Sequence, residues 1–151
     1  MSAAVVRAAR REDAAAILTL VRALAEFEEL PGPDDAAAAR LVEHGFGPHP
    51  LFEGLVAELD GAVVAYAIFF TTYSTFRMRP TLFLEDVFVH PAARRRGVAT
   101  TIMTRLRAIA VERGCGRFEW MVLDWNAGAQ ALYAKLGATQ LDDWRLCRVD
   151  L

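Results

Sequence analysis

The sequence has few of the features that mark secreted, membrane-spanning or metal-dependent proteins. It contains two cysteines, Cys115 and Cys147, which lie far apart and lack the spacing of metal ligands, so we expect two reduced thiols and no bound metal. Residues 1–11 lack an apolar signal core, and no apolar run reaches the ~18 residues of a membrane span. These absences lead us to expect a soluble, cytoplasmic protein without a membrane partner.

An excess of positive charge is also missing. The formal net charge is -2, and Lys135 is the single lysine among 17 basic residues. One short arginine run, at 94–96, stands on this acidic chain, so we expect no nucleic-acid partner. The 151 residues are 54% hydrophobic and contain no repeat or obvious linker. We therefore predict a single domain over residues 1–151.

The spacing of apolar residues predicts alternating strands and helices. Apolar side chains at helical spacing predict helices at 12–29 and 97–113. Two further helices are expected at 34–44, where Asp34 can cap the start, and at 126–136, where Gly137 closes the end. Strands are expected at 5–6, 55–59, 62–73, 81–89, 118–123 and 144–149. Asp60-Gly61 is typical of a tight hairpin turn. The order β-α-α-β-β-β-α-β-α-β predicts an α/β domain with a mixed sheet.

The first candidate site is Arg94-Arg95-Arg96-Gly97-Val98-Ala99, between an apolar strand and an amphipathic helix. Glycine allows close approach of a ligand to the backbone, and the first amides of a helix suit phosphate oxygens. Flanking arginines can add charge-assisted contacts to a diphosphate. A solvated basic turn before a helix is the alternative, and the residues alone leave both open.

The second candidate is Glu85-Asp86, which interrupts the apolar run Leu82-Phe83-Leu84 and Val87-Phe88-Val89. Adjacent strand residues point to opposite faces, so a regular strand cannot send both carboxylates to solvent if both faces of the sheet are covered. Burying a charge is costly without a partner. The pair either meets arginines or helix-end amides, or acts as an acid or base beside a bound amine. A β-bulge here would re-aim the side chains and is common near active sites.

The third candidate lies on the helix expected after Asp124-Trp125. Asn126 and Tyr133 are seven residues apart, about two helical turns, and share a face with Ala129 and Gln130. Tyr133 is either ordinary rim packing or a phenol placed beside a leaving group.

Together these segments resemble the GNAT acetyltransferase superfamily. The family's coenzyme A motif, Gln/Arg-x-x-Gly-x-Gly/Ala, is matched by Arg94-x-x-Gly97-x-Ala99 in the expected strand-to-helix context. The chain is further similar to the diamine branch, which includes spermidine/spermine and thialysine acetyltransferases. The segments that carry this similarity are 24–28, 44–50, 55–58, 83–89, 125–126, 133 and 144–145.

The resemblance implies a GNAT fold: a mixed, mostly antiparallel central sheet with splayed strands, flanked by about four helices. It also implies acetyl-CoA as cosubstrate, a small-molecule amine as acceptor and a homodimer. Glu85 would receive the proton of the amine, and Tyr133 would protonate the leaving thiolate, either in concert or with a lowered pKa. The residues expected to bind the cofactor are Val87, Phe88, Val89, Arg94, Arg95, Arg96, Gly97, Val98, Ala99, Thr100, Asn126 and Ala129. Those expected to border the amine are Phe27, Glu28, Glu85, Asp86, Glu119, Trp120 and Met121.

One departure from the branch bears on the substrate. Polyamine enzymes carry an acidic residue and a tryptophan in the loop before the Leu-Glu-Asp strand, whereas this chain has Arg77 and Arg79 there. Arginines would repel a long polycation, so we expect a smaller amine, or one that also carries a carboxylate. The alternatives are acetylation of a protein lysine or N-terminus, and a non-catalytic coenzyme A-binding module.

Overall fold

The computed structural model describes residues 2–151 and groups them into two compact units. The first unit extends to Met121 and contains the sheet, whereas the second begins at Val122 and contains one helix. Single-domain organisation over 1–151 stays a prediction. Within the described residues, no helix is both long and apolar enough to span a membrane.

The first unit follows the order of strands and helices that the sequence predicts. Asp34 caps the second helix as expected, because its side chain accepts a hydrogen bond from the Ala37 amide at 2.8 Å. The elements are β1 (Val5–Ala8), η1 (Arg11–Asp13), α1 (Ala14–Phe27), α2 (Asp35–Phe46), β2 (Glu53–Leu59), β3 (Ala62–Ser74), β4 (Arg79–Val89), η2 (Pro91–Ala93), α3 (Val98–Glu112) and β5 (Arg117–Trp120).

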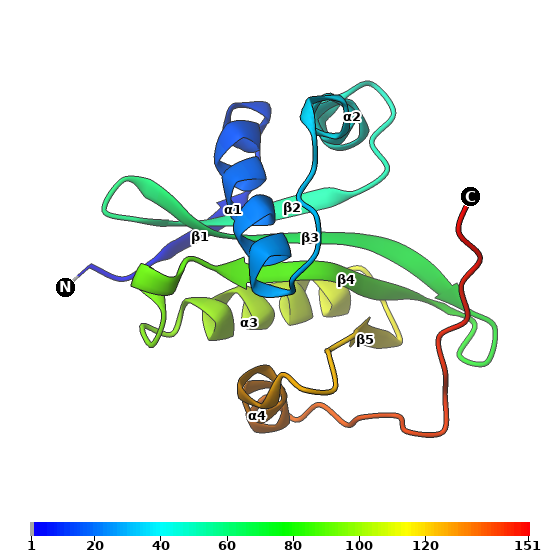
Figure 1. The fold of residues 1–151 in the computed structure, drawn as a ribbon. Helices are drawn as coiled ribbons and strands as arrows, with labels where there is room; N and C mark the ends of the chain where they lie inside the picture. The colour runs from blue at the N-terminus through cyan, green and yellow to red at the C-terminus, as the bar shows by residue number, and fades with distance from the viewer. Residues whose placement is uncertain (1) are drawn as a thin grey trace. The chain divides into compact units, whose positions relative to one another are not determined.

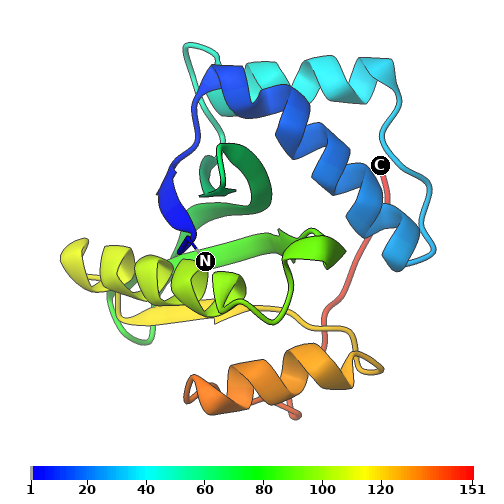
Figure 2. The same ribbon diagram turned by 90° about the vertical axis from the view of Figure 1, so that its left-hand side faces the viewer.

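The five strands form one sheet in the order β1-β2-β3-β4-β5. The first four strands are antiparallel neighbours, and β5 runs parallel to β4, which confirms the mixed, mostly antiparallel sheet. The turn between β2 and β3 is the expected two-residue hairpin, since Asp60 and Gly61 both have positive φ, 52° and 81°. Figure 1 shows α1 and α2 on one face of the sheet and α3 on the other, and Figure 2 shows the same from the side.

Each face of the sheet carries its own apolar layer. On the α1 side, Ile17 and Leu20 pack with side chains of β2, β3 and β4. On the α3 side, Ile102 and Leu106 are completely buried, as helical spacing along α3 predicts. Fully burying an aliphatic side chain of this size contributes about 2 kcal/mol, so the two layers hold the helices firmly on the sheet.

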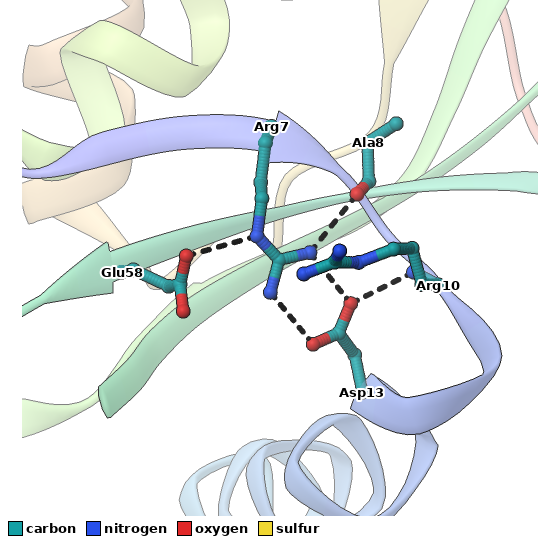
Figure 3. Close-up of polar contacts among 5 residues, drawn as sticks. All are labelled: Arg7, Ala8, Arg10, Asp13 and Glu58. Atoms are coloured by element: carbon teal, nitrogen blue, oxygen red, sulfur yellow. Dashed lines mark hydrogen bonds and ion pairs between the residues drawn. The ribbon is translucent and has the colours of Figure 1, made fainter. Parts of the chain in front are cut away.

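A partly buried ion-pair network fixes the start of α1 to the sheet (Figure 3). Arg7 of β1 donates two hydrogen bonds to the Asp13 carboxylate, at 2.8 and 2.9 Å, and a third to Glu58 of β2 at 2.9 Å. Asp13 also accepts from the Arg10 amide at 2.7 Å. The hydrogen bonds from Arg7 hold the pKa of Asp13 below its usual range. The network therefore ties β1, β2 and the first turn of α1 together.

The second unit contains α4 (Ala127–Lys135) followed by an extended tail. Asn126 caps this helix, because its side-chain oxygen accepts from the Ala129 amide at 3.2 Å. The strand predicted at 144–149 is wrong, since these residues have no regular structure, and Trp144 and Val149 are 72% and 84% exposed. The alternating pattern lacks a pairing partner within this unit, and a strand needs a ladder to form.

Candidate active site

Strand β4 carries a β-bulge at Glu85. Ile68 pairs with Asp86 and the next residue of β3, Phe69, pairs with Leu84, so Glu85 is left without a partner in the ladder. Directly opposite residues share a face of the sheet. The bulge therefore places Leu84 on the α3 side with Phe69, and Asp86 on the α1 side with Ile68. The re-aiming considered from the sequence is confirmed, because Asp86 lies on the face opposite to Leu84.

Asp86 is the half-buried member of the pair. Its Oδ2 accepts a hydrogen bond from the hydroxyl of Tyr66 on β3, at 3.3 Å. Burial first, and then the negative charge of Glu85, raise the pKa of Asp86 to about 6. The hydrogen bond from Tyr66 opposes this shift, and the charge of Glu28 adds to it.

Three carboxylates thus act on one another at the end of α1 and the middle of β4. Glu85 is exposed, Glu28 is half-buried just after the last residue of α1, and both raise the pKa of Asp86 through their charge. Within residues 2–151 no cluster of three or more acidic, histidine or cysteine side chains is arranged to hold a metal ion. The group is instead a region of negative potential that suits a cation with several hydrogen-bond donors, such as an alkylammonium.

Arg94 lies against aromatic rings beside this acidic region. Its guanidinium carbon is 5.7 Å from the centre of the Phe27 ring and 5.5 Å from that of Phe88. Its Nε donates to the carbonyl of Val89 at 3.2 Å. Arg94 therefore joins the end of α1 to the end of β4, and these contacts restrict the movement of its side chain toward a phosphate. Its assignment to the cofactor stays a prediction.

The loop between η2 and α3 has the backbone expected of an anion site. Arg95 and Gly97 both have positive φ, 59° and 74°, and Gly97 is the N-cap of α3. No side chain caps this helix, so the amides of its first turn face the loop without a side-chain acceptor. Arg95 and Arg96 are exposed beside it. A left-handed non-glycine residue is uncommon and concentrates at ligand clamps, which favours the phosphate-binding interpretation over a solvated turn. The remaining residues assigned to this loop are Val98, Ala99 and Thr100, the first three positions of α3.

Between the acidic region and this loop, β4 loses its neighbour on one side. The parallel pairing of β4 with β5 ends at Leu84 and Trp120, one residue before the bulge. Residues 86–89 continue to pair with β3 alone. The backbone groups of residues 87–89 that point away from β3 therefore have no strand partner, although the carbonyl of Val89 already accepts a hydrogen bond from Nε of Arg94.

The β5 residues predicted to border the amine separate onto different faces. Glu119 pairs with Phe83 and so lies on the α1 side of the sheet, where it forms a 3.9 Å ion pair with Arg117. Trp120 pairs with Leu84 and lies on the α3 side, against Phe118 with ring centres 4.7 Å apart. Met121 follows the strand and is exposed. The structure therefore brings Glu28, Glu85 and Asp86 together but divides the β5 group.

Tyr133 belongs to the second unit, as do Asn126 and Ala129. It is half-buried on α4, and burial raises the pKa of its phenol. This direction is opposite to the lowered pKa considered from the sequence, and it keeps the hydroxyl protonated at neutral pH. Asn126 and Ala129 bond to each other at the helix cap.

Sequence reasoning missed Tyr66. It lies within the apolar run of β3, which indicates an ordinary core residue, and the structure buries it completely. The register reveals its role: Tyr66 pairs with Phe88 and Ile68 pairs with Asp86, which places the phenol diagonally from the carboxylate. A phenol in a run of aliphatic residues opposite a charged pair is the one signal that the sequence offered.

Comparison with known proteins agrees with this geometry. Residues 9–138 match the model of the acetyltransferase (GNAT) family. The chain is similar to thialysine N-epsilon-acetyltransferases, at 37% identity to the Mus musculus protein (95% of this chain, 88% of that protein) and 34% to the Sus scrofa protein (99% and 94%). Its fold is similar to the crystal structure of a possible acetyltransferase from Clostridium difficile 630, with a TM-score of 0.85, 20% identity and 99% of both chains covered. The chain therefore belongs to the GNAT acetyltransferase family and is an acetyl-transferring enzyme.

Proposed function

We propose that this enzyme transfers the acetyl group of acetyl-CoA to a primary amine of a small molecule, by direct attack of the amine in a ternary complex. One observation carries the proposal: the acidic region of Glu28, Glu85 and Asp86 adjoins the open edge of β4, which leads to the loop of Arg95 and Gly97. The acidic region, the edge of β4 and the loop follow one another along one surface of the first unit. The amine, the thioester arm and the diphosphate of a ternary complex would follow one another in the same order.

The cofactor would lie along β4 and end at α3. Its pantetheine amides would pair with the open backbone of residues 87–89, and its diphosphate would rest on the first amides of α3. Arg95 and Arg96 would add charge-assisted hydrogen bonds to the phosphates. Acetyl-CoA itself supplies the activated thioester.

The amine must lose a proton before it attacks. An alkyl amine of pKa ~10.4 costs roughly 4.6 kcal/mol to deprotonate at pH 7. Asp86 would hold the ammonium by charge, and the exposed Glu85 would receive the proton, directly or through water. Of the two amides near the thioester, that of Phe88 points to β3 in the register with Tyr66, so the amide of Val89 would stabilise the oxyanion of the tetrahedral intermediate.

The leaving thiolate needs a proton at the end of the reaction. Tyr133 would supply it in concert with bond breaking, because full transfer from a phenol of pKa ~10 to a thiolate of pKa ~8.5 is uphill by roughly 2 kcal/mol. The burial that raises the pKa of Tyr133 further makes a separate transfer step still less favourable. Neither cysteine has a role in this scheme.

A small acceptor fits the position of the arginines. Arg79 precedes Glu85 by six residues of strand, about 20 Å, and Arg77 donates to the Gly116 carbonyl at 3.4 Å. These cations would meet only a long acceptor, so they would oppose a polycation without touching a short amine. The Mus musculus relative is named for the ε-nitrogen of thialysine, which supports a small amine.

Free-thiol release from acetyl-CoA across a panel of amines tests the proposal. The panel contains thialysine, lysine, putrescine, spermidine, amino sugars and a lysine peptide. We expect turnover on a short primary amine and little on spermidine. Turnover on the peptide alone would support a protein substrate, and cofactor binding without turnover on any amine would support a binding module.

We also propose that the enzyme is a homodimer. The tail after α4 exposes Trp144, Leu146 and Val149, at 72%, 65% and 84%. Large apolar side chains exposed in one short segment are typical of an interface. Phe46 is half-buried against the α1-side core and contributes less exposed surface than Trp144. Sedimentation equilibrium measures the mass, and a monomer at all concentrations would contradict this proposal.

A further inference from the structure

The hydroxyl of Tyr66 is a polar group in an otherwise apolar layer. Tyr66 is completely buried in the cluster of Ile17, Leu20, Val56, Ile68 and Phe88. A buried hydroxyl without a partner costs free energy, and every buried side-chain nitrogen or oxygen in residues 2–151 has one. The hydrogen-bond partner of Tyr66 is Asp86. Phenylalanine would fill the same space without this requirement, so the hydroxyl calls for an explanation beyond packing.

The bulge at Glu85 is what brings the two groups together. In a regular strand, Asp86 would continue the α3-side series of Leu82 and Leu84. The extra residue turns it to the α1 side, above the Tyr66 hydroxyl. The hydroxyl binds Oδ2, so Oδ1 of Asp86 takes no part in this contact.

The hydrogen bond from Tyr66 suits the ionised form of Asp86. Burial raises the pKa of Tyr66 well above its usual range, so the phenol stays protonated and donates. Hydrogen bonding to the charged form of Asp86 favours that form, against burial and the charges of Glu85 on β4 and Glu28 after α1. On the same face, Glu119 of β5 pairs with Arg117, and Arg94 lies on Phe27 and Phe88. Among these groups Tyr66 is the one with a hydrogen bond to Asp86.

We propose that Tyr66 is a positioning residue, whose hydroxyl holds the Asp86 carboxylate in one orientation, with its second oxygen facing the cationic acceptor beside Glu85. This proposal rests on the proposed function, because it takes the acidic region to be the amine site. The 3.3 Å separation is long for a hydroxyl and a carboxylate. Such bonds often tighten when the substrate is bound, so the contact would shorten as the ammonium draws Asp86 into place.

The test is Tyr66→Phe, which removes one oxygen and keeps the ring. With a turned-over amine, we expect kcat/KM to fall about 10-fold, the scale of a hydrogen bond to a charged group, mainly through a higher KM for the amine. The acid limb of the kcat/KM profile should move to higher pH, because Asp86 loses the donor that favours its charged form. The KM for acetyl-CoA should not change. Tyr73→Phe is the matched control: the same change on the same strand at an exposed residue, expected to leave all these values unchanged.

A structural role alone predicts a different result. Tyr66→Phe would then change the melting temperature but leave the amine KM and the acid limb where they are, and that outcome overturns the proposal. In an Asp86→Asn background, Tyr66→Phe should have no further effect on the amine KM, whereas an undiminished effect there also overturns it. Should Tyr66→Phe fail to fold, Asp86→Asn, which keeps an oxygen acceptor for the hydroxyl, should raise the amine KM and change the acid limb, which would then report the proton acceptor Glu85 alone; an unchanged acid limb contradicts the proposal.

A titration separates this proposal from the proposed function. The carboxyl carbon of Asp86, followed by NMR in the chain without ligand, reports its pKa whether or not any amine is acetylated. We expect a higher pKa in Tyr66→Phe than in the wild type and in Tyr73→Phe. Equal values would overturn the positioning role even in an active enzyme. Absence of turnover in the wild type, with the shift present, would count against the proposed function alone.

Discussion

Replacing Asp86 with asparagine should stabilise the folded chain while it impairs the enzyme. The carboxylate is half-buried beside Glu85 and Glu28, and its pKa is raised from 3.8 to about 6. A folded chain that binds this proton more tightly than the unfolded chain is favoured at low pH. The stability that this proton contributes is lost as pH rises from about 4 through 6, because the unfolded chain releases the proton first. Asparagine cannot ionise, and its side-chain oxygen still accepts from Tyr66.

The size of the effect follows from the two pKa values. The difference between about 6 and 3.8 is roughly 2 pH units, and each unit corresponds to 1.36 kcal/mol, which gives about 3 kcal/mol for full ionisation. Partial exposure of the carboxylate lets water screen part of this cost. We therefore expect Asp86→Asn to gain about 1–3 kcal/mol at pH 8 and almost nothing at pH 4.

Urea unfolding at pH 4, 5, 6, 7 and 8 measures the difference directly. The free energy of unfolding of Asp86→Asn minus that of the wild type should grow with pH and level off above pH 7. Asp13→Asn is the control of opposite sign. Asp13 is bound by Arg7, which lowers its pKa, so this stability contribution is present at neutral pH and lost on acidification below about 4. A stability difference between Asp86→Asn and the wild type that is independent of pH would contradict the raised pKa of Asp86 in the folded chain.

Three further predictions follow. Asp13→Asn should cost about 2–3 kcal/mol at pH 7, because it leaves the Arg7 guanidinium without its bidentate partner, and urea unfolding should show the loss vanish at acid pH; an unchanged midpoint at pH 7 would argue against the network. Tyr133→Phe should cut kcat of thiol release by about 100-fold and spare the dissociation constant of coenzyme A, whereas an unaffected kcat would remove its role as acid. Gly97→Ala should lower stability by about 1 kcal/mol, since φ is 74°, and raise the KM for acetyl-CoA. Gly128→Ala, on α4 and outside the positive-φ group, should be neutral or stabilising in the same melts and kinetics; equal effects of the two changes would contradict the role of the loop.

The sequence predicted those parts of the fold that local chemistry determines. Helical spacing found α1 and α3, the Asp60-Gly61 pair found the hairpin, and Arg94-x-x-Gly97-x-Ala99 found the start of α3. Each of these depends on residues within one or two turns of the chain. The last strand was wrong because pairing depends on a partner elsewhere, and 144–149 has none within its unit.

In the candidate site, too, local features could be predicted from the sequence, whereas features that depend on strand pairing could not. Two adjacent carboxylates in an apolar strand were visible as an anomaly, but their sequence could not tell which one is buried. That depends on the bulge, which shifts the register between β3 and β4 and turns Asp86 to the α1 side. Tyr66 lies 20 residues away along the chain, and only the register brings its hydroxyl to Asp86. Contacts fixed by register are beyond a reading of local patterns.

The most direct test of the central claim is the product formed from acetyl-CoA and thialysine. Free thiol and acetylated amine are measured together, by colour reaction and mass spectrometry, for the wild type and for Asp86→Asn. We expect equal amounts of thiol and N-acetylated thialysine from the wild type, and a much higher amine KM for Asp86→Asn with acetyl-CoA binding intact. Thiol release that does not depend on the amine, or an amine KM that Asp86→Asn leaves unchanged, would contradict the claim that an amine is acetylated at the acidic region of β4.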